Sequence, residues 1–337
     1  MGERFAPPKK NYVPDDVGFQ TKPEIALDLV RRALANGVRV KAWTFDELYG
    51  RSGPFLDDLT KQGQAFVGEI PSDFHVWLAK PRVARTRGDS RGRGVARRVT
   101  CARRASQVRH LRRHSPDFYG QRPQRYRIKD GHRGPEVWEV RWRTCWRRTS
   151  GPELVSLQHT LLIARNVLTD ETKYFLANRV PGQPGWNLRA LLRIAFGRWS
   201  IEQVFREVKE ELGFDHYECR GWGCIHRHLA CVILSQLFCA QVRQKLSPSE
   251  DVLSASRLTL EQVRRAVAIF VSAQRMPPRH RRACYRRELG RQHYYQRRNA
   301  QAYKSHHKTR RKRLVALGID SDRIKSCVPK NSDPRHE

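Results

Sequence analysis

Apolar residues at helical spacing mark the first predicted element, over residues 24–35. Ile25, Leu29 and Ala33 recur every four residues and therefore lie on one face of a helix. Asn36 and Gly37 follow directly, and this pair is typical of a helix end. The pattern predicts an amphipathic helix packed against a core.

A β–α–β succession follows that helix. The run 38–45 is rich in β-branched and aromatic residues and ends at Asp46, residues 54–61 predict a helix, and 65–70 predicts a second strand. Strands joined through a helix pair in parallel, and side chains at their carboxyl ends face the ligand crevice. Asp46 is therefore a candidate site residue, although an Asp between a strand and a helix is more commonly an N-cap.

Strand-like patterns return in the middle of the chain and predict a small β-rich insertion. The four predicted strands are 126–128, 137–142, 161–166 and 174–176. Two long helices are expected after them, over 188–212 and 225–246, with a turn at 213–223. The apolar run 229–240 is shorter than the ~20 residues that a bilayer requires, so we expect a buried helix and no membrane association.

Charge is the strongest compositional signal. The chain has 337 residues, with 66 Lys and Arg against 33 Asp and Glu, giving a formal net charge of +33. Such an excess is typical of proteins that bind a polyanion, most often DNA or RNA. The cations concentrate in segments 82–113 and 275–313. We interpret 82–113 as a flexible basic arm; alternatively, part of it reflects a GC-rich genome or a frameshifted stretch.

The eight cysteines are irregularly spaced, which indicates free thiols rather than a disulfide framework. Cys219, Cys224, His226 and His228 raise the alternative of a structural zinc site, but their spacing matches no standard zinc finger. Residues 1–16 lack the apolar stretch of a secretory signal. We expect a cytoplasmic, nucleoid-associated protein.

A charged trio lies in the first long helix. At about 100° per residue, Arg198, Glu202 and Lys209 fall within roughly 40° of one another. An adjoining apolar stripe would put the trio on the rim of a buried face; its members are Ile194, Ile201, Phe205, Val208 and Leu212. A carboxylate flanked by cations suits metal-assisted phosphoryl chemistry. The plainer interpretation is an exposed i, i+4 ion pair.

The segment RWSIEQVFREVKEELG (198–213) has the spacing R-x3-E-x6-K, which resembles the Y-R-E-K signature of bacterial insertion-sequence transposases of the DDE type. Ala195 stands at the tyrosine position. Further blocks are similar to the same family: FQTKPEIALDLV (19–30) with FDELYG (45–50), LLIARN (161–166), KYFLAN (173–178) and CRGWGCIHRHLA (219–230). The basic C-terminal region fits the family as well.

The resemblance implies an α/β, ribonuclease H-like catalytic core that uses two Mg²⁺ or Mn²⁺ ions. Asp46 would be the second and Glu202 the third carboxylate ligand. Arg198 and Lys209 would position DNA phosphates. Further DNA-binding residues implied by the matching blocks and the basic tail are Arg220, Trp222, Arg227, His228 and Arg298. In the family, the metal ions activate water for strand cleavage and the freed 3′-hydroxyl then attacks target DNA.

The family's first catalytic aspartate has no counterpart here, because the block 19–30 begins within twenty residues of Met1. We therefore expect an N-terminally truncated core with an exposed strand edge, and an inactive enzyme; alternatively, the start codon is assigned too far downstream. The expected organisation is as follows: 1–80, partial core; 81–125, arginine-rich arm; 126–187, β-rich insertion; 188–246, helical part of the core; 247–337, basic region that is helical or disordered.

Two functions follow. The first is a DNA transposase homologue acting on element ends and target DNA, with a homodimer expected on paired ends. The alternative is a non-catalytic protein that binds nucleic acid through phosphate contacts, independently of sequence.

Overall fold

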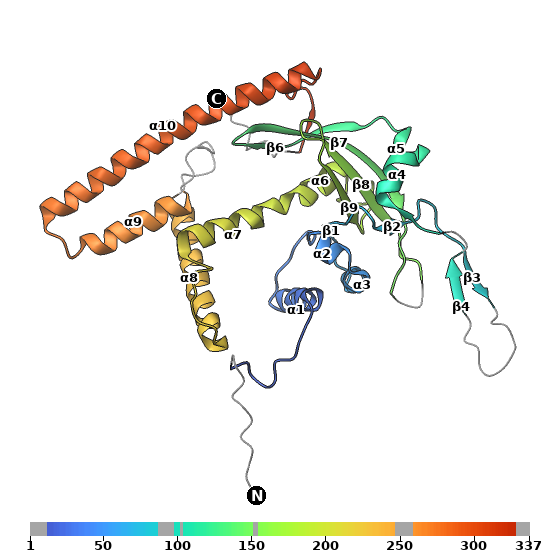
Figure 1. Ribbon diagram of the computed structural model, residues 1–337, viewed down its shortest axis with the longest axis horizontal. Helices are drawn as coiled ribbons and strands as arrows, with labels where there is room; N and C mark the ends of the chain where they lie inside the picture. Colours follow the sequence, from blue (N-terminus) through green and yellow to red (C-terminus); the bar gives the residue numbers. More distant parts are fainter. Residues whose placement is uncertain (1–11, 87–97, 102–103, 151–153, 247–258, 328–337) are drawn as a thin grey trace, which may run out of the picture. The chain divides into compact units, whose positions relative to one another are not determined.

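The computed structural model describes residues 12–86, 98–101, 104–150, 154–246 and 259–327 (Figure 1). The chain divides into two compact units. One comprises Gln20–Arg198 and His306–Pro329 and is called the sheet unit below. The other comprises Met1–Phe19, Trp199–Ser305 and Lys330–Glu337 and is called the helical unit.

A six-stranded mixed sheet organises the sheet unit, in the order β1-β9-β8-β7-β6-β10. Its strands are β1 (Val67–Glu69), β6 (Gln124–Gly131), β7 (Gly134–Cys145), β8 (His159–Asn166), β9 (Thr172–Ala177) and β10 (Lys325–Ser326). Neighbours pair antiparallel except β10, which pairs parallel to β6. The four strands predicted in the middle of the chain are confirmed as β6 to β9. They form one sheet with β1.

Residues 43–45 hydrogen-bond in parallel to the region of β1. Trp43 N donates to the carbonyl oxygen of Ala65, Val67 N to that of Trp43, and Glu69 N to that of Phe45, each at 2.9 Å. The predicted parallel pairing is thus confirmed, but the predicted strand 38–45 is confirmed only at its end. Within the described residues, the backbone of Thr44 makes no hydrogen bond, so this edge of the sheet is open.

Local sequence signals define the helices before β1. Helix α1 (Lys22–Ala35) begins with a capping box, in which Thr21 N donates to Glu24 Oε2 at 2.7 Å. Helix α2 (Glu47–Gly50) is capped by Asp46 and α3 (Gly53–Lys61) by Ser52. Leu56 and Leu59 of α3 are fully buried. These helices match the predicted succession.

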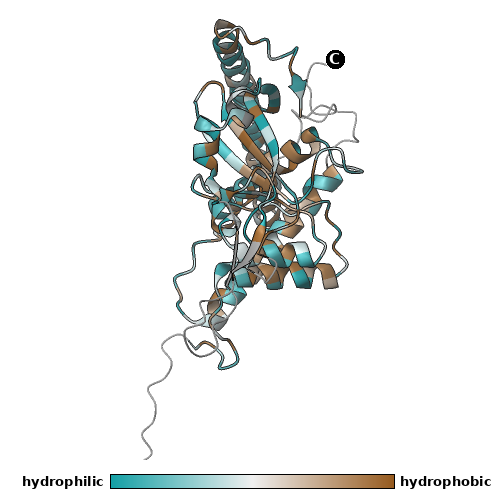
Figure 2. Cartoon of the chain, turned by 90° about the vertical axis from the view of Figure 1, so that its right-hand side faces the viewer, coloured by the Kyte–Doolittle hydropathy of each residue, from teal (hydrophilic) through white to brown (hydrophobic). Residues whose placement is uncertain are grey.

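Alternating side chains give the sheet two apolar faces. On β8, Leu161 and Ile163 belong to the cluster that contains Phe66 and α3, whereas Leu162 and Ala164 belong to the opposite cluster. Helix α6 (Leu188–Gly197) covers this second face with Leu191 and Leu192. Figure 2 shows hydrophobic and hydrophilic residues in alternating bands along the strands. Burial on both faces explains why these segments become strands.

Both ends of the arginine-rich segment 82–113 are structured. Strand β3 (Val83–Thr86) pairs antiparallel with β4 (Arg98–Cys101), and β2 (His75–Val76) with β5 (Ser106–Gln107). Helix α4 (Val108–His114) buries Val108 and Leu111 in the core, and α5 (Pro116–Tyr119) follows it. The expectation of a flexible arm is therefore wrong at both ends, because β3 pairs with β4 at the first end and Val108 and Leu111 anchor the second end in the core. Residues 87–97 and 102–103 lie outside the described residues.

The helical unit contains α7 (Trp199–Leu212), α8 (Trp222–Leu246), α9 (Leu260–Ala273) and most of α10 (Pro278–Ala316). The helix predicted over 188–212 is α6 and α7, which meet at Arg198. A small cluster of Cys239, Leu260 and Val263 joins α8 to α9. Arg264 Nε donates to Glu211 Oε2 at 2.8 Å and ties α9 to α7. The basic C-terminal region is helical over α10.

The predicted buried helix 229–240 lies in α8, but most of α8 is exposed. Only Val232 and Cys239 are buried, whereas Leu234 is 64% and Phe238 51% exposed. The apolar residues of α8 lie on all of its sides, and α7 and α9 cover only part of the helix. Among the described residues, α8 has the length and the apolar composition that a membrane-spanning helix needs. This alone is weak evidence for a span.

Candidate functional site

Asp46 follows segment 43–45, at the carboxyl end of its parallel pairing with β1. Its Oδ1 accepts a hydrogen bond from Leu48 N at 3.0 Å and caps α2. Both sequence interpretations of this residue thus meet in one side chain, since it is an N-cap and also stands where crevice residues are expected. Oδ2 has no hydrogen-bond partner within the part of the chain that the structure describes.

Glu69 lies opposite Asp46 in the parallel register, and no sequence motif marks it. The bridge between Trp43 and Phe66 and the hydrogen bond from Glu69 N to Phe45 place residue 46 opposite residue 69. Directly opposite residues project to the same face of a sheet, with Cβ atoms about 5 Å apart. Two carboxylates therefore share one end of the sheet. Glu69 is the last residue of β1 and the next to last of the predicted strand 65–70, so its position near the carboxyl end was a usable signal.

Cations surround Glu69 in the sheet unit. Lys173 Nζ donates to Glu69 Oε1 at 3.1 Å, and an Arg198 guanidinium nitrogen lies 3.9 Å from Oε2. The Glu69 side chain is only 12% exposed, so this compensation is needed to keep its charge in place. Arg198 is the predicted DNA-positioning arginine, and this carboxylate holds it next to the Asp46 end of the sheet.

Glu202 and Lys209 lie on α7, in the helical unit, and both are exposed. They are seven residues apart and share one face of the helix. The predicted rim of a buried face is wrong, because Ile201 is 48% and Phe205 49% exposed. Val208 is the one buried residue of α7. The two predicted carboxylates, Asp46 and Glu202, thus belong to different units.

The segment 219–228 presents three predicted DNA-binding residues near the start of α8. Arg220 and Arg227 are exposed, and the Trp222 ring stacks 4.2 Å from that of His226. His228, the fourth predicted residue there, is part-buried, and its Nε2 lies 2.9 Å from the carbonyl oxygen of Gly213. It therefore stabilises the turn before α8.

Helix α10 carries a basic stripe within the helical unit. At about 100° per residue, six exposed residues fall within roughly 60° of one another: Arg279, Arg282, Arg286, His293, Arg297 and Lys304. We call this set the α10 stripe. At 1.5 Å per residue it extends over roughly 38 Å. None of its Arg or Lys side chains has an acidic partner among the described residues.

The one acid of α10, Glu288, faces away from the stripe. It accepts from Arg265 Nε of α9 at 3.3 Å, and Arg291 one turn later donates to Glu261 at 2.7 Å. Arg298, the predicted residue here, is exposed and lies about 100° from Arg297 around the helix. Internal ion pairs thus use the opposite face of α10, and the stripe keeps its full positive charge.

No group of three or more His, Cys, Asp or Glu side chains suited to a metal ion occurs within the described ranges. This holds for the cysteine and histidine segment 219–228 too, where the alternative of zinc was considered. All eight cysteines are free thiols. At the end of the sheet, Asp46 offers one carboxylate oxygen, while Lys173 and Arg198 neutralise Glu69. The described residues of the sheet unit do not by themselves complete a two-metal cage.

Residues 4–135 match the family described as DDE superfamily endonuclease. The matched stretch contains Asp46 and Glu69 and ends at the start of β7; Arg198, Glu202 and Lys209 lie outside it. A search of curated proteins finds no match. The match supports a DDE-type, transposase-like family for residues 4–135, with nuclease- or transposase-like activity and DNA as substrate in general.

Proposed function

We propose that this protein is a homologue of insertion-sequence transposases that binds DNA and lacks the full set of carboxylates for strand cleavage and transfer. The observation that carries the proposal is the family match over 4–135 together with the position of Asp46 at the carboxyl end of a parallel pair. In this proposal Asp46 and Glu202 are two of the three ligands of a Mg²⁺ or Mn²⁺ pair. Such ions would polarise the scissile phosphate and activate water.

The roles of the remaining site residues follow from their charge and exposure. Arg198 and Lys209 would contact DNA phosphates near the carboxylates, and Arg220, Trp222, Arg227 and Arg298 would extend this contact over the helical unit. We also propose that the protein forms a homodimer on paired element ends and associates with the nucleoid.

A second candidate function is sequence-independent nucleic-acid binding without any metal chemistry. The α10 stripe favours it, since its unpaired cations extend over roughly 38 Å, or about eleven base pairs of duplex. Exposed tyrosines interleave with the cations, among them Tyr294 and Tyr295 at 52% each. Such rings can stack on unpaired bases.

Nicking of supercoiled plasmid with Mg²⁺ or Mn²⁺ tests the proposal. We expect the wild-type chain to bind DNA in EDTA and to nick it no faster than Asp46→Asn or Glu202→Gln. Metal-dependent nicking that either substitution abolishes would mean that the chain holds a complete catalytic set. Failure to bind DNA would overturn both candidate functions.

The effect of Mn²⁺ on DNA affinity separates the two candidates. If Asp46 and Glu202 hold metal ions against a phosphate, Mn²⁺ strengthens DNA binding by the wild-type chain more than by either variant. A protein without metal chemistry shows the same weak, purely ionic response in all three.

A further inference from the structure

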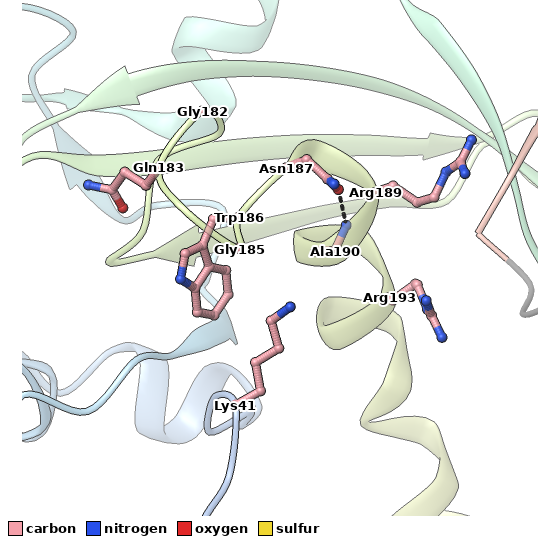
Figure 3. A pocket seen from close by; sticks show the side chains of 9 residues that line it. All are labelled: Lys41, Gly182, Gln183, Gly185, Trp186, Asn187, Arg189, Ala190 and Arg193. Atoms are coloured by element: carbon pink, nitrogen blue, oxygen red, sulfur yellow. Dashed lines mark hydrogen bonds between the residues drawn. The ribbon is translucent and has the colours of Figure 1, made fainter.

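A surface hollow of about 510 Å³ lies where α6 begins (Figure 3). Lys41, Trp186, Arg189 and Arg193 are among the residues that line it, and all belong to the sheet unit. Figure 3 shows Lys41 extending toward the Trp186 indole, while Arg189 and Arg193 project from successive turns of α6. No residue that lines the hollow is acidic.

No acidic side chain of the described residues neutralises the cations of this hollow. Lys41, Arg189 and Arg193 form no ion pair with any described residue. Arg189 and Arg193 are spaced i, i+4, and like charges at this spacing destabilise a helix. The first turn of α6 contains no acid, so the positive end of the helix dipole adds to the same repulsion. A bound anion would relieve all of these costs.

The loop before α6 is rigidly built. Gly182 (φ +104°) and Gly185 (φ +76°) occupy left-handed conformations, which glycine adopts without strain. Gly182 N donates to the carbonyl oxygen of Trp186, and Trp186 N donates to that of Gln183, each at 2.9 Å. Asn187 then caps α6, accepting from Ala190 N at 2.8 Å. Hydrogen bonds thus hold the backbone of this side of the hollow.

Trp186 orients the lysine. Its indole is half-buried, Lys41 Nζ lies 5.3 Å from the ring centroid, and the Arg179 guanidinium lies 5.9 Å from it. Cation–π attraction holds an ammonium in place without neutralising it. Lys41 therefore remains available to a ligand.

This hollow is a different place from the Asp46 site. Lys41 precedes segment 43–45 and Asp46 follows it, so the two residues mark opposite ends of the same extended stretch. Five residues of extended chain separate them by up to about 17 Å. A ligand in the hollow does not require the carboxylates.

We propose that the hollow binds phosphate groups of a nucleic-acid strand, through Arg189, Arg193 and Lys41. Arg matches phosphate oxygens with paired N–H donors, and the lysine adds a point charge. The choice of nucleic acid as the source rests on the proposed function. The phosphate chemistry rests only on the unpaired cations.

Salt dependence of DNA binding tests the site in the full chain, in EDTA and on the Asp46→Asn background. For Arg189→Gln/Arg193→Gln we expect the slope of log K against log salt to become shallower by about 1.4 for single strands or about 1.8 for duplex. The control Arg31→Gln/Lys61→Gln removes two cations of the same unit that already lie beside Asp28 and Asp58, and it should leave the slope unchanged.

Two checks keep the result interpretable. The thermal midpoint of Arg189→Gln/Arg193→Gln should be unchanged or higher, since a like-charge pair is removed. Arg189→Lys/Arg193→Lys keeps both charges, so its slope should stay at the wild-type value. Equal slopes for the hollow variant and its control would overturn the proposal.

Inorganic phosphate and dAMP distinguish the source of the phosphate. DNA binding that depends on Arg189 and Arg193 supports a nucleic-acid strand as the ligand. If only the binding of inorganic phosphate or dAMP depends on these two residues, the hollow is a site for a small phosphate compound. If neither depends on these residues, the site is refuted. If the chain binds no DNA, the proposed function fails. Titration with inorganic phosphate then still tests whether the hollow binds phosphate through Arg189 and Arg193.

Discussion

The two units satisfy their charged and apolar groups in opposite ways. In the sheet unit, Arg147 is 2% exposed and pairs with Asp57, and strand residues such as Leu162 are fully buried. In the helical unit, Leu234 is 64% exposed, and the α10 stripe has no acidic partner in the part of the chain that the structure describes. The sheet unit therefore derives its stability from internal contacts, whereas the surface of the helical unit is suited to an external partner.

The buried ion pair gives the largest expected effect. Asp57→Ala would leave the Arg147 guanidinium buried without its carboxylate and remove the acceptor of Ser150 N, which lies 2.7 Å from Asp57 Oδ2. We expect a loss of about 3–5 kcal/mol in the free energy of unfolding, measured in urea.

The adjacent residue supplies a matched control. Asp58 is 36% exposed and forms only surface pairs with Arg31 and Lys61. Asp58→Ala should cost less than about 1 kcal/mol. Equal losses for the two variants would refute the contrast between buried and surface charges.

His159 predicts a pH dependence confined to the sheet unit. Burial, together with the nearby Arg147 charge, lowers the pKa of His159 to about 4. Its Nδ1 lies 2.7 Å from the carbonyl oxygen of Leu157, which assigns the proton to Nδ1, and the buried Nε2 has no partner among the described residues. The folded state therefore holds a neutral imidazole.

The sign of this effect follows from linkage. The unfolded chain binds a proton near pH 6.5, so stability is complete above that pH and is lost as pH falls toward 4. The loss amounts to about 3 kcal/mol. Unfolding free energies measured from pH 7 to 4 should fall more steeply for the wild type than for His159→Gln. Parallel curves would contradict a neutral buried histidine.

Neutralising the α10 stripe should affect binding and leave folding intact. For Arg286→Gln/Arg297→Gln we expect the salt slope of duplex binding to become shallower by about 1.8, with the unfolding curve unchanged. The control Arg31→Gln/Lys61→Gln removes two cations that already lie beside Asp28 and Asp58, so its slope should match the wild type. If the salt slope of the stripe variant changes no more than that of this control, contact between the α10 stripe and DNA is refuted.

The smallest effect separates the two roles of Asp46. Asp46→Ala removes the cap on Leu48 N and should cost about 1 kcal/mol, whereas Asn caps a helix about as well as Asp. Chemical denaturation of both variants tests this. If Asp46→Asn destabilises as much as Asp46→Ala, it is no clean probe of metal binding.

Local signals explain what the sequence could predict. The strand-like runs 161–166 and 174–176 predicted β8 and β9, and Asn36 with Gly37 marked the end of α1. Asp46 was found because a β-rich run ends where a helix begins. Each inference depends on residues that are close in the chain.

Non-local contacts explain the rest. Glu69 joins Asp46 only through strand register, and Arg147 meets Asp57 across 90 residues. The exposure of α8 was missed because an apolar run looks the same whether or not other helices cover it. The hollow at α6 likewise needs Lys41 beside Trp186, which are far apart in sequence.

The salt dependence of DNA affinity for the intact chain tests the central claim most directly. Contact through six or more phosphates predicts an affinity that falls on the order of a thousandfold between 50 and 200 mM salt, equally for wild type and Asp46→Asn/Glu202→Gln in EDTA. An affinity that changes less than about tenfold over this range, or binding that requires the two carboxylates, would contradict the account.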